Sequence, residues 1–188
     1  MKIRRTLTPG HGDEGFSLTE VVLIVAVLFV VTGISIPLVN NTVRGLQLSS
    51  DARQIASSLG YAKAAATAQM TRYQILFHVD GNSWRLQKYN RGTSSFDTEG
   101  TSAHLTGWHS GTGIVLQASS SSAPAGFPTS SSSFIRFNSR GIPVNSSGVP
   151  TSNNVIYLTG YGTKFAVTVS LVGRIQVWKY ESSGWVSQ

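Results

Sequence analysis

The sequence predicts an α+β fold, in which one long N-terminal helix precedes an antiparallel β-sheet head. Two patterns support this prediction. No charged residue lies between Glu20 and Arg44, and apolar residues then recur at three- and four-residue spacing as far as Met70. From Arg72 onwards, short apolar runs alternate with turn residues, which is typical of strands. The chain has 188 residues, which leaves room for one modest globular core after the helix.

Residues 1–15 form a polar leader with basic residues at its start. Lys2, Arg4 and Arg5 favour a cytoplasmic N-terminus, because positive charge beside a membrane helix tends to stay on that side. A secretory signal peptide would run directly from its basic residues into an apolar core, with a small-residue cleavage site after that core. Here residues 6–14 are polar, and no Ala-x-Ala site follows the apolar run. The pattern thus differs from that of a secretory signal peptide. Because the N-terminus is expected to be cytoplasmic, we expect the part of the chain beyond the apolar run to be exported.

Residues 16–39 are predicted to form a transmembrane helix. The uncharged interval after Glu20 is longer than the roughly 20 residues that a helix needs to cross a bilayer. An acidic residue at the centre of such a helix costs about 2.5–3.5 kcal/mol, so Glu20 at the mouth of this segment requires a partner or a role. A plain single-pass anchor, with Glu20 reaching interfacial water, is the simpler alternative. Pro37 removes a backbone hydrogen bond, and we expect a helix kink there.

Residues 40–71 are predicted to continue the helix with one apolar face. The apolar positions are Val43, Leu46, Ile55, Ala56, Leu59, Ala62, Ala66 and Met70. Asp51, Arg53 and Lys63 fall mostly between these positions, so we expect them on the solvated face. Gly60 lowers the helix propensity and is expected to mark close packing.

Residues 72–188 are predicted to form the β-rich head. Asp80-Gly81-Asn82 separates two alternating runs, and an Asp-Gly turn at such a place is a strong hairpin signal. Residues 118–133 are rich in serine and are expected to form a mobile loop. Two further segments, 90–107 and 144–154, are also expected to be loops. The predicted strands are residues 73–79, 83–89, 113–118, 134–138, 155–159, 164–171 and 174–180.

The composition limits what can stabilise the chain and what it can bind. It contains no cysteine, which excludes disulfides and thiolate metal sites. The net charge of +7 favours acidic partners, such as nucleic acid, anionic lipid or an acidic protein surface. The cations are nevertheless spread from Arg44 to Lys179 without a run of like charge, so a solvated, mildly basic surface is the simplest interpretation.

No residue pattern indicates catalysis. His104 and His109 lie near Asp97 and Glu99, but their spacing fits no recognised metal site, and the segment is as polar as a solvated loop. The sequence has no Gly-x-Ser-x-Gly motif, no His-Glu-x-x-His motif and no phosphate-binding loop. We therefore predict a protein that is not an enzyme and that uses no metal or other cofactor.

The segment Gly15-Phe16-Ser17-Leu18-Thr19-Glu20, ahead of a long apolar helix, resembles the processing site of type IV pilins and pseudopilins. The resemblance implies that a membrane-embedded prepilin peptidase cuts after Gly15 and then methylates the new N-terminal residue, Phe16. It also implies that Glu20 meets the Phe16 amine of a neighbouring subunit and so sets the register of a filament. In a medium of low dielectric constant, such a charge pair offsets desolvation that neither group alone would tolerate.

The C-terminal half resembles a subgroup of that family, the H-type pseudopilins of type II secretion and the related FimT-like minor pilins. The matching segments are Phe134-Ile135-Arg136-Phe137-Asn138, Arg140-Gly141, Val155-Ile156-Tyr157-Leu158 and Gly173-Arg174-Ile175. The resemblance implies the pilin fold, in which a sheet-rich head packs on the second half of the helix. It also makes Arg174 a candidate contact for a ligand or a partner.

The resemblance leaves three functions open. The first is a pseudopilin subunit of a type II secretion filament, which takes part in protein export across the outer membrane. The second is a minor pilin of a type IV pilus, which serves assembly priming, motility or adhesion. The third is a pilus subunit that binds DNA for uptake. Some FimT-like relatives carry a second basic residue after the Gly-Arg pair, whereas this chain has Gln176 there, which weakens the interpretation with nucleic acid as the partner.

The resemblance also implies partners and a location. The partners are sister pseudopilins or pilins, the prepilin peptidase, an inner-membrane assembly platform, and the membrane itself through the N-terminal helix. The location is the bacterial inner membrane, crossed once, with the N-terminus in the cytoplasm and the head in the periplasm. A periplasmic filament or a pilus then takes up the subunit.

Overall fold

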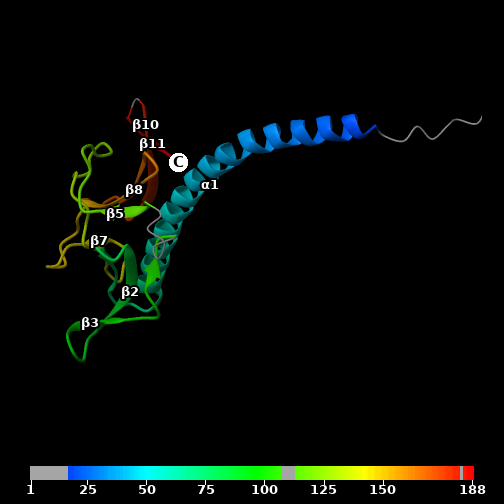
Figure 1. The fold of residues 1–188 in the computed structure, drawn as a ribbon. Coiled ribbons are helices and arrows are strands. Elements are labelled where there is room, and N and C mark those ends of the chain that lie inside the picture. The colour runs from blue at the N-terminus through cyan, green and yellow to red at the C-terminus, as the bar shows by residue number, and fades with distance from the viewer. Residues whose placement is uncertain (1–16, 107–112, 183) are drawn as a thin grey trace, which may run out of the picture. The chain divides into compact units, whose positions relative to one another are not determined.

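The computed structural model describes residues 17–106, 113–182 and 184–188, without the side chains of residues 34–42 and 44. The chain divides into two compact units, Met1–Asn41 and Thr42–Gln188. Figure 1 shows that the second unit contains the later turns of one helix and a group of short strands beside them. The predicted α+β class is therefore confirmed, with a helix packed against antiparallel sheets.

Helix α1 spans Leu18–Ala68 and contains 51 residues. It begins after Ser17, whose carbonyl accepts hydrogen bonds from the amides of Glu20 at 2.9 Å and Val21 at 3.1 Å. It ends where Met70 adopts a left-handed conformation with φ of 49°, which is a common way to stop a helix. The helix was expected to continue to residue 71, so its end lies slightly earlier than predicted.

The face of α1 that packs on the head is apolar and fully buried. Leu48, Ala52, Ile55, Leu59, Ala62 and Ala66 are each 0% exposed, and they follow the spacing of one helix face. The expected face also included Val43, Leu46 and Met70, and these three are exposed, so that part of the prediction is wrong. Gly60 is not a site of close packing either, because a Cβ atom added there would meet no other atom within 4 Å.

The head contains two antiparallel sheets, where the sequence predicted one. Sheet A has the order β3-β2-β1-β6-β7 with β4 also paired to β2, and sheet B has the order β11-β10-β9-β8-β5. The strands of sheet A are β1 (Tyr73–His78), β2 (Ser83–Asn90), β3 (Ser95–Thr98), β4 (Ala103–His104), β6 (Phe134–Phe137) and β7 (Pro143–Val144). The strands of sheet B are β5 (Val115–Gln117), β8 (Asn154–Gly160), β9 (Thr163–Val169), β10 (Ile175–Glu181) and β11 (Gly184–Ser187).

Four short strands lie where the sequence predicted none. β3 and β4 fall within the expected loop 90–107, β7 begins just before the expected loop 144–154, and β11 follows the last predicted strand. Each is an edge or peripheral strand that pairs with a longer neighbour, for example β11 with β10. Strands this short carry too few alternating residues for a periodic pattern, so their existence depends on the partner strand.

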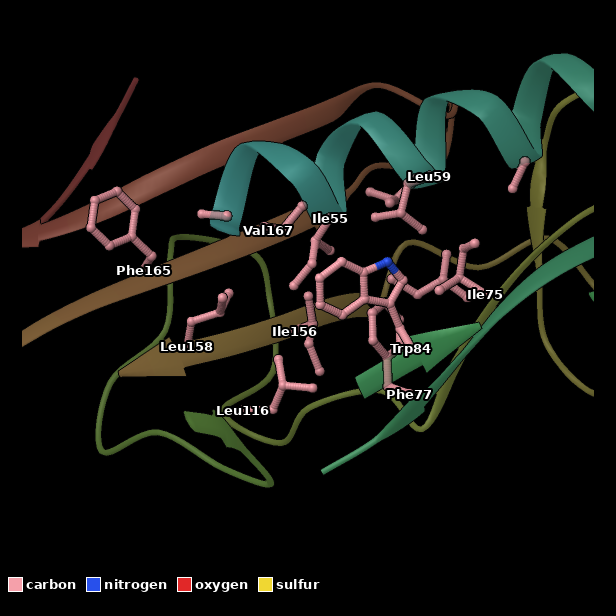
Figure 2. Packing of buried hydrophobic residues seen from close by; sticks show 14 of the residues in the cluster. Ile55, Leu59, Ile75, Phe77, Trp84, Leu116, Ile156, Leu158, Phe165 and Val167 are labelled. Atoms are coloured by element: carbon pink, nitrogen blue, oxygen red, sulfur yellow. The ribbon is translucent and has the colours of Figure 1, made fainter. Parts of the chain in front are cut away.

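The core lies between the helix and the two sheets (Figure 2). Ile55 and Leu59 of α1 point towards Trp84 of sheet A and Ile156 of sheet B in that view. Trp84 is 1% exposed, and its indole Nε1 donates a hydrogen bond of 3.1 Å to the hydroxyl of Ser58 on α1. Burial of a large ring with its polar atom satisfied fixes the helix against sheet A.

The serine-rich segment 118–133 is a loop, as expected, and hydrogen bonds tie it to sheet B. The hydroxyl of Tyr157 donates a hydrogen bond of 2.7 Å to the carbonyl of Pro128, and burial raises the pKa of Tyr157 to about 12. The Ser132 amide donates to the carbonyl of Val155 at 2.7 Å. A second apolar cluster, which includes Phe127 of the segment, lies on the same strands. Composition alone did not predict these contacts, because the partners of the segment are distant in sequence.

Candidate functional site

The predicted processing site lies partly outside the described residues. Gly15 and Phe16 belong to the part of the chain that the structure does not describe. Glu20 is exposed and sits in the first turn of α1. A carboxylate is favourable at this end of a helix, because the free amides carry partial positive charge. The roles of Gly15, Phe16 and Glu20 in cleavage, methylation and filament register stay predictions.

The N-terminal part of α1 exposes many apolar side chains. The large apolar side chains from Leu18 to Val31 are between 43% and 81% exposed. They are Leu18, Val21, Val22, Leu23, Ile24, Val25, Val27, Leu28, Phe29, Val30 and Val31. An exposed apolar surface of this kind marks a region that another molecule or a membrane covers.

Among the described residues, no helix combines the length and the apolar character needed for a membrane span. The assignment of residues 16–39 as a transmembrane helix stays a prediction. The kink expected at Pro37 stays one as well. The helical assignment runs without interruption from Leu18 to Ala68 and therefore across Pro37.

Arg174 lies on a tight turn between β9 and β10. The turn is closed by a hydrogen bond of 2.8 Å from the Gly173 amide to the Ser170 carbonyl, and the Arg174 amide donates to the Ser170 hydroxyl at 3.2 Å. The Arg174 side chain is exposed and makes no hydrogen bond or ion pair with any described residue. The turn therefore places the Arg174 side chain at the surface, where its guanidinium is accessible to a partner.

A second turn, between β6 and β7, carries Arg140. The side-chain oxygen of Asn138 accepts hydrogen bonds from the amides of Arg140 at 2.9 Å and Ile142 at 3.1 Å. The backbone φ of Gly141 is +73°, in the left-handed region that favours glycine. Arg140 is exposed, like Arg174 on the neighbouring turn.

Lys63 of α1 joins the two turns. Its Nζ donates a hydrogen bond of 2.9 Å to the carbonyl of Gly173. A Cβ atom added at Gly141 would lie 3.2 Å from Lys63 Cε, and one added at Gly173 would lie 2.6 Å from the Gly141 carbonyl oxygen. We name the group formed by the half-buried Lys63 and the exposed Arg140 and Arg174 the two-turn basic site. Lys63 and Arg140 were not predicted as site residues, although a glycine beside each arginine was a sequence signal for the two turns.

Gln176 lies on β10, opposite Thr168 of β9, and is half-buried. It shares the side of the strand that Arg174 would occupy, because side chains two residues apart point the same way. A neutral amide therefore stands where a second cation would have extended the two-turn basic site. The positive charge of that site is limited to the three residues from α1 and the two turns.

Asp51 was expected on the solvated face of the helix, and the structure shows that this is wrong, because it is 1% exposed. Its carboxylate accepts hydrogen bonds from the Thr106 amide, at 3.2 and 3.1 Å to the two oxygens, and from the Thr106 hydroxyl at 2.6 Å. Burial raises the pKa of Asp51, and the bonds from Thr106 partly oppose this shift. Asp51 therefore fastens the segment after β4 to the helix.

The residues considered as metal ligands do not converge in the described part of the chain. His104 is half-buried on β4, and Asp97 accepts a hydrogen bond of 2.7 Å from the Asn90 side chain. His109 lies outside the described residues. Among the residues that are described, no three His, Asp or Glu side chains are placed to hold a metal ion. The arrangement of described groups supports binding surfaces, of which the two-turn basic site is one.

Comparison with known proteins gives one family match. The family described as Type II transport protein GspH matches residues 51–173, which is well over half of the chain. The matched region begins at the buried Asp51 and ends at Gly173, beside Arg174. It therefore contains most of the core, together with Lys63 and Arg140 of the two-turn basic site. No protein with a curated description matches the chain.

Two solved structures are similar. The minor pseudopilin EpsH from the Type 2 Secretion System of Vibrio cholerae is 12% identical, with a TM-score of 0.49, over 70% of this chain and 95% of EpsH. The type IV minor pilin FimU of Pseudomonas aeruginosa is 17% identical, with a TM-score of 0.50, over 74% of this chain and 92% of FimU. At this identity, the likeness to FimU shows a common fold.

Proposed function

Because this chain belongs to the GspH family of type II transport proteins, we propose that it is a pseudopilin subunit of a type II secretion filament. In that role it takes part in protein export across the outer membrane. The observation that carries the proposal is the family match over residues 51–173, which covers most of the buried helix face, all of sheet A and strands β5, β8 and β9 of sheet B. A binding role also agrees with the exposed side chains of Arg140 and Arg174 on the two turns.

The N-terminal segment supplies the assembly signal in this proposal. A prepilin peptidase cuts after Gly15 and methylates the amine of Phe16. Glu20 pairs with the Phe16 amine of a neighbouring subunit and sets the register of the filament. The support is the sequence around the junction, together with the exposed position of Glu20 in the first turn of α1.

Residues 16–39 hold the subunit in the inner membrane until an assembly platform extracts it, and Pro37 lets the helix bend as it packs. The N-terminus lies in the cytoplasm and the head in the periplasm, where sister pseudopilins form the filament with this chain. The support is the exposed apolar surface between Leu18 and Val31, since contact with lipid or with other apolar helices would cover it.

A minor pilin of a type IV pilus is the second candidate, and the common fold with FimU favours it. In either assembly, the two-turn basic site with Arg174 contacts an acidic surface of a neighbouring subunit. Binding of DNA for uptake has less support, because Gln176 is neutral and the cations of the two-turn basic site are few. A non-specific phosphate contact would also weaken steeply with salt.

Deletion of the gene in the native host separates the two leading candidates. We expect the deletion to abolish export of the proteins that the host releases by type II secretion, while surface pili and twitching motility remain. Restoring the wild-type gene should restore export, and a Glu20→Leu gene should not. Normal export together with lost pili would contradict the pseudopilin role and support the minor pilin.

A further inference from the structure

The face of sheet A that points away from the core carries three arginines. Gln74 pairs with Gln87 on one side and with Arg136 on the other, so these three residues form a row across β2, β1 and β6. The next row along β1 places Leu76 opposite Arg85. Side chains alternate along strands, so this face is opposite the one whose residues are buried in the core. We name it the arginine face, defined by Arg72, Arg85 and Arg136.

Aromatic rings stack against two of these arginines. The Arg72 guanidinium lies 3.8 Å from the centroid of the Tyr89 ring, and Tyr89 meets Phe96 edge to face at 5.3 Å. The Arg136 guanidinium lies 4.3 Å from the Phe96 ring and 4.9 Å from the Phe134 ring. Stacking on a ring restrains a guanidinium but leaves the N–H groups at its edge free to bind an anion.

Hydrogen bonds hold Arg136 in place. Its Nε and Nη2 donate to the Gln74 side-chain oxygen at 3.0 and 2.8 Å, and its Nη1 donates to the Ser146 carbonyl at 3.2 Å. The Gln74 amide in turn donates to the Gln87 side-chain oxygen at 2.7 Å. All of these acceptors are neutral, so they orient the guanidinium without compensating its charge.

None of the described strands of sheet A carries an acidic residue on this face, although Asp97 lines a neighbouring pocket together with Tyr89 and Arg91. Burial lowers the pKa of Arg136, and the nearby positive charge of Arg72 lowers it further. Asp97 is the one acidic residue within β1, β2, β3 and β6. It alternates with the outward Phe96 and so points to the opposite side of the sheet. The repulsion between the Arg72 and Arg136 guanidiniums is relieved when an anion binds beside Arg72.

A pocket beside Arg72 and Tyr89 would accept such an anion. Its volume is about 250 Å³, and it is lined by Arg72, Arg91, Tyr89, Asn138, Ser139, Thr71 and Met70. One Nη of Arg91 donates to the Met70 carbonyl at 3.1 Å, which leaves its other N–H groups for a ligand. The lining of this pocket thus combines two guanidiniums, three hydroxyls and one amide, with no acidic group.

We propose that the arginine face binds a carboxylate-bearing segment of a different protein chain, with one carboxylate seated between Arg72 and Arg91. A planar guanidinium matches a carboxylate through paired hydrogen bonds. Nucleic acid fits less well, because the guanidiniums already cover the rings on which bases would stack. A second copy of this chain fits less well too, because both copies carry a net charge of +7 and repel each other.

The proposal goes beyond the function proposed above, since it names the chemistry of a partner for the head. It depends on sheet A and on the adjoining pocket, and not on the N-terminal segment. Loss of export in a deletion strain and binding at this face are separate measurements. A negative result for export would not contradict binding at the arginine face, and a negative result for binding would not contradict the role in export.

The test measures binding of a fluorescein-labelled peptide of alternating glutamate and glycine to the full-length protein in non-ionic detergent. We expect Arg72→Gln and Arg91→Gln each to weaken binding about tenfold, because each removes a charge-assisted hydrogen bond. Arg53→Gln is the matched control, since it removes the same charge from an exposed position on α1. The control should change the affinity less than about twofold. Unchanged thermal melting checks that each variant folds.

Three results would overturn the proposal. The first is an equal loss in all three variants, which would mean that net charge alone attracts the peptide. The second is equal binding of a matched peptide that carries glutamine in place of glutamate. The third is displacement of the peptide by oligothymidine at a lower concentration than by unlabelled glutamate peptide, which would assign the face to nucleic acid.

Discussion

Two glycines determine how Arg140 and Arg174 are presented together. Gly141 and Gly173 both have left-handed backbones, with φ of 73° and 74°. The position of a Cβ at Gly173 lies 2.6 Å from the Gly141 carbonyl oxygen and 3.1 Å from Lys63 Nζ. A side chain at Gly173 would therefore separate the turns and displace the lysine that binds them.

Gly173→Ala should destabilise the head more than Gly162→Ala. Both glycines have positive φ, but a Cβ at Gly162 would meet no atom within 4 Å. Each variant bears a backbone strain of about 1–2 kcal/mol, and Gly173→Ala adds an overpacking cost of about 1–3 kcal/mol. Denaturant unfolding of both variants measures the difference. Equal losses would contradict the close contact between the two turns.

Asp51 links the protonation of one buried carboxyl to the stability of the head. Burial raises its pKa above the ordinary value of 3.8, so the folded protein binds this proton more tightly than the unfolded chain does. The contribution of the group to the free energy of unfolding is therefore largest below about pH 3.8. It falls as the pH rises from there through the raised pKa.

Asp51→Asn should remove this part of the pH dependence. Relative to the variant, the wild-type protein should lose stability as the pH rises from about 4 to 7, because ionising the buried carboxyl is unfavourable. Denaturant unfolding at several pH values measures this difference. Asp80→Asn, at an exposed position, is the control for the loss of one carboxylate. A difference between wild type and Asp51→Asn that is constant with pH would contradict the burial of Asp51.

At the scale of elements, helix α1 and the long strands follow from local patterns. Apolar spacing predicted the buried Ile55 and Leu59, and the Asp-Gly turn predicted the β1–β2 hairpin, in which Tyr73 pairs with Lys88. The buried part of the helix face begins later in the sequence than predicted. Val43 and Leu46 were expected to be buried and are exposed, whereas Leu48 and Ala52 are buried. Spacing alone does not show where along a helix the head begins.

Gly60 lies in the interior of α1 with open space around it, so alanine should replace it without a clash. Gly60→Ala should stabilise the head by about 0.5–1 kcal/mol, because glycine is the weaker helix former. Ala64→Gly, at an exposed position on the same helix, is the reverse control and should destabilise by a similar amount. The midpoints of denaturant unfolding measure both effects. A destabilising Gly60→Ala would show a close neighbour that the structure does not contain.

The elements that sequence patterns missed depend on partners far along the chain. The serine-rich segment gains order from Tyr157, whose hydroxyl binds the Pro128 carbonyl, and from Trp185 on β11, whose Nε1 donates to Ser122 at 3.2 Å. Neither contact can be predicted from the local composition of residues 118–133. Likewise, the two-turn basic site needs Lys63 and Gly173, which are 110 residues apart, and no periodicity links them.

For the whole molecule, the class of fold and the family were predictable, but the division of the head into two sheets was not. The family follows from particular residues at the N-terminal junction and around Gly173-Arg174, and the match over residues 51–173 confirms it. The order of strands depends on which pairs form. β5, for example, joins β8 in sheet B although residues 134–144 form β6 and β7 of sheet A between them. Pairing across such distances is a property of the packed core and not of any local segment.

Intact mass with N-terminal sequencing of the protein from membranes of its native host tests the central claim most directly. The account predicts a chain that begins at N-methylated Phe16 and lacks residues 1–15. The Glu20→Leu variant should be processed in the same way, because the proposed role of Glu20 follows cleavage. A chain that keeps residues 1–15 in cells with an active prepilin peptidase would contradict assembly as a pseudopilin. It would leave an exported head on a simple anchor.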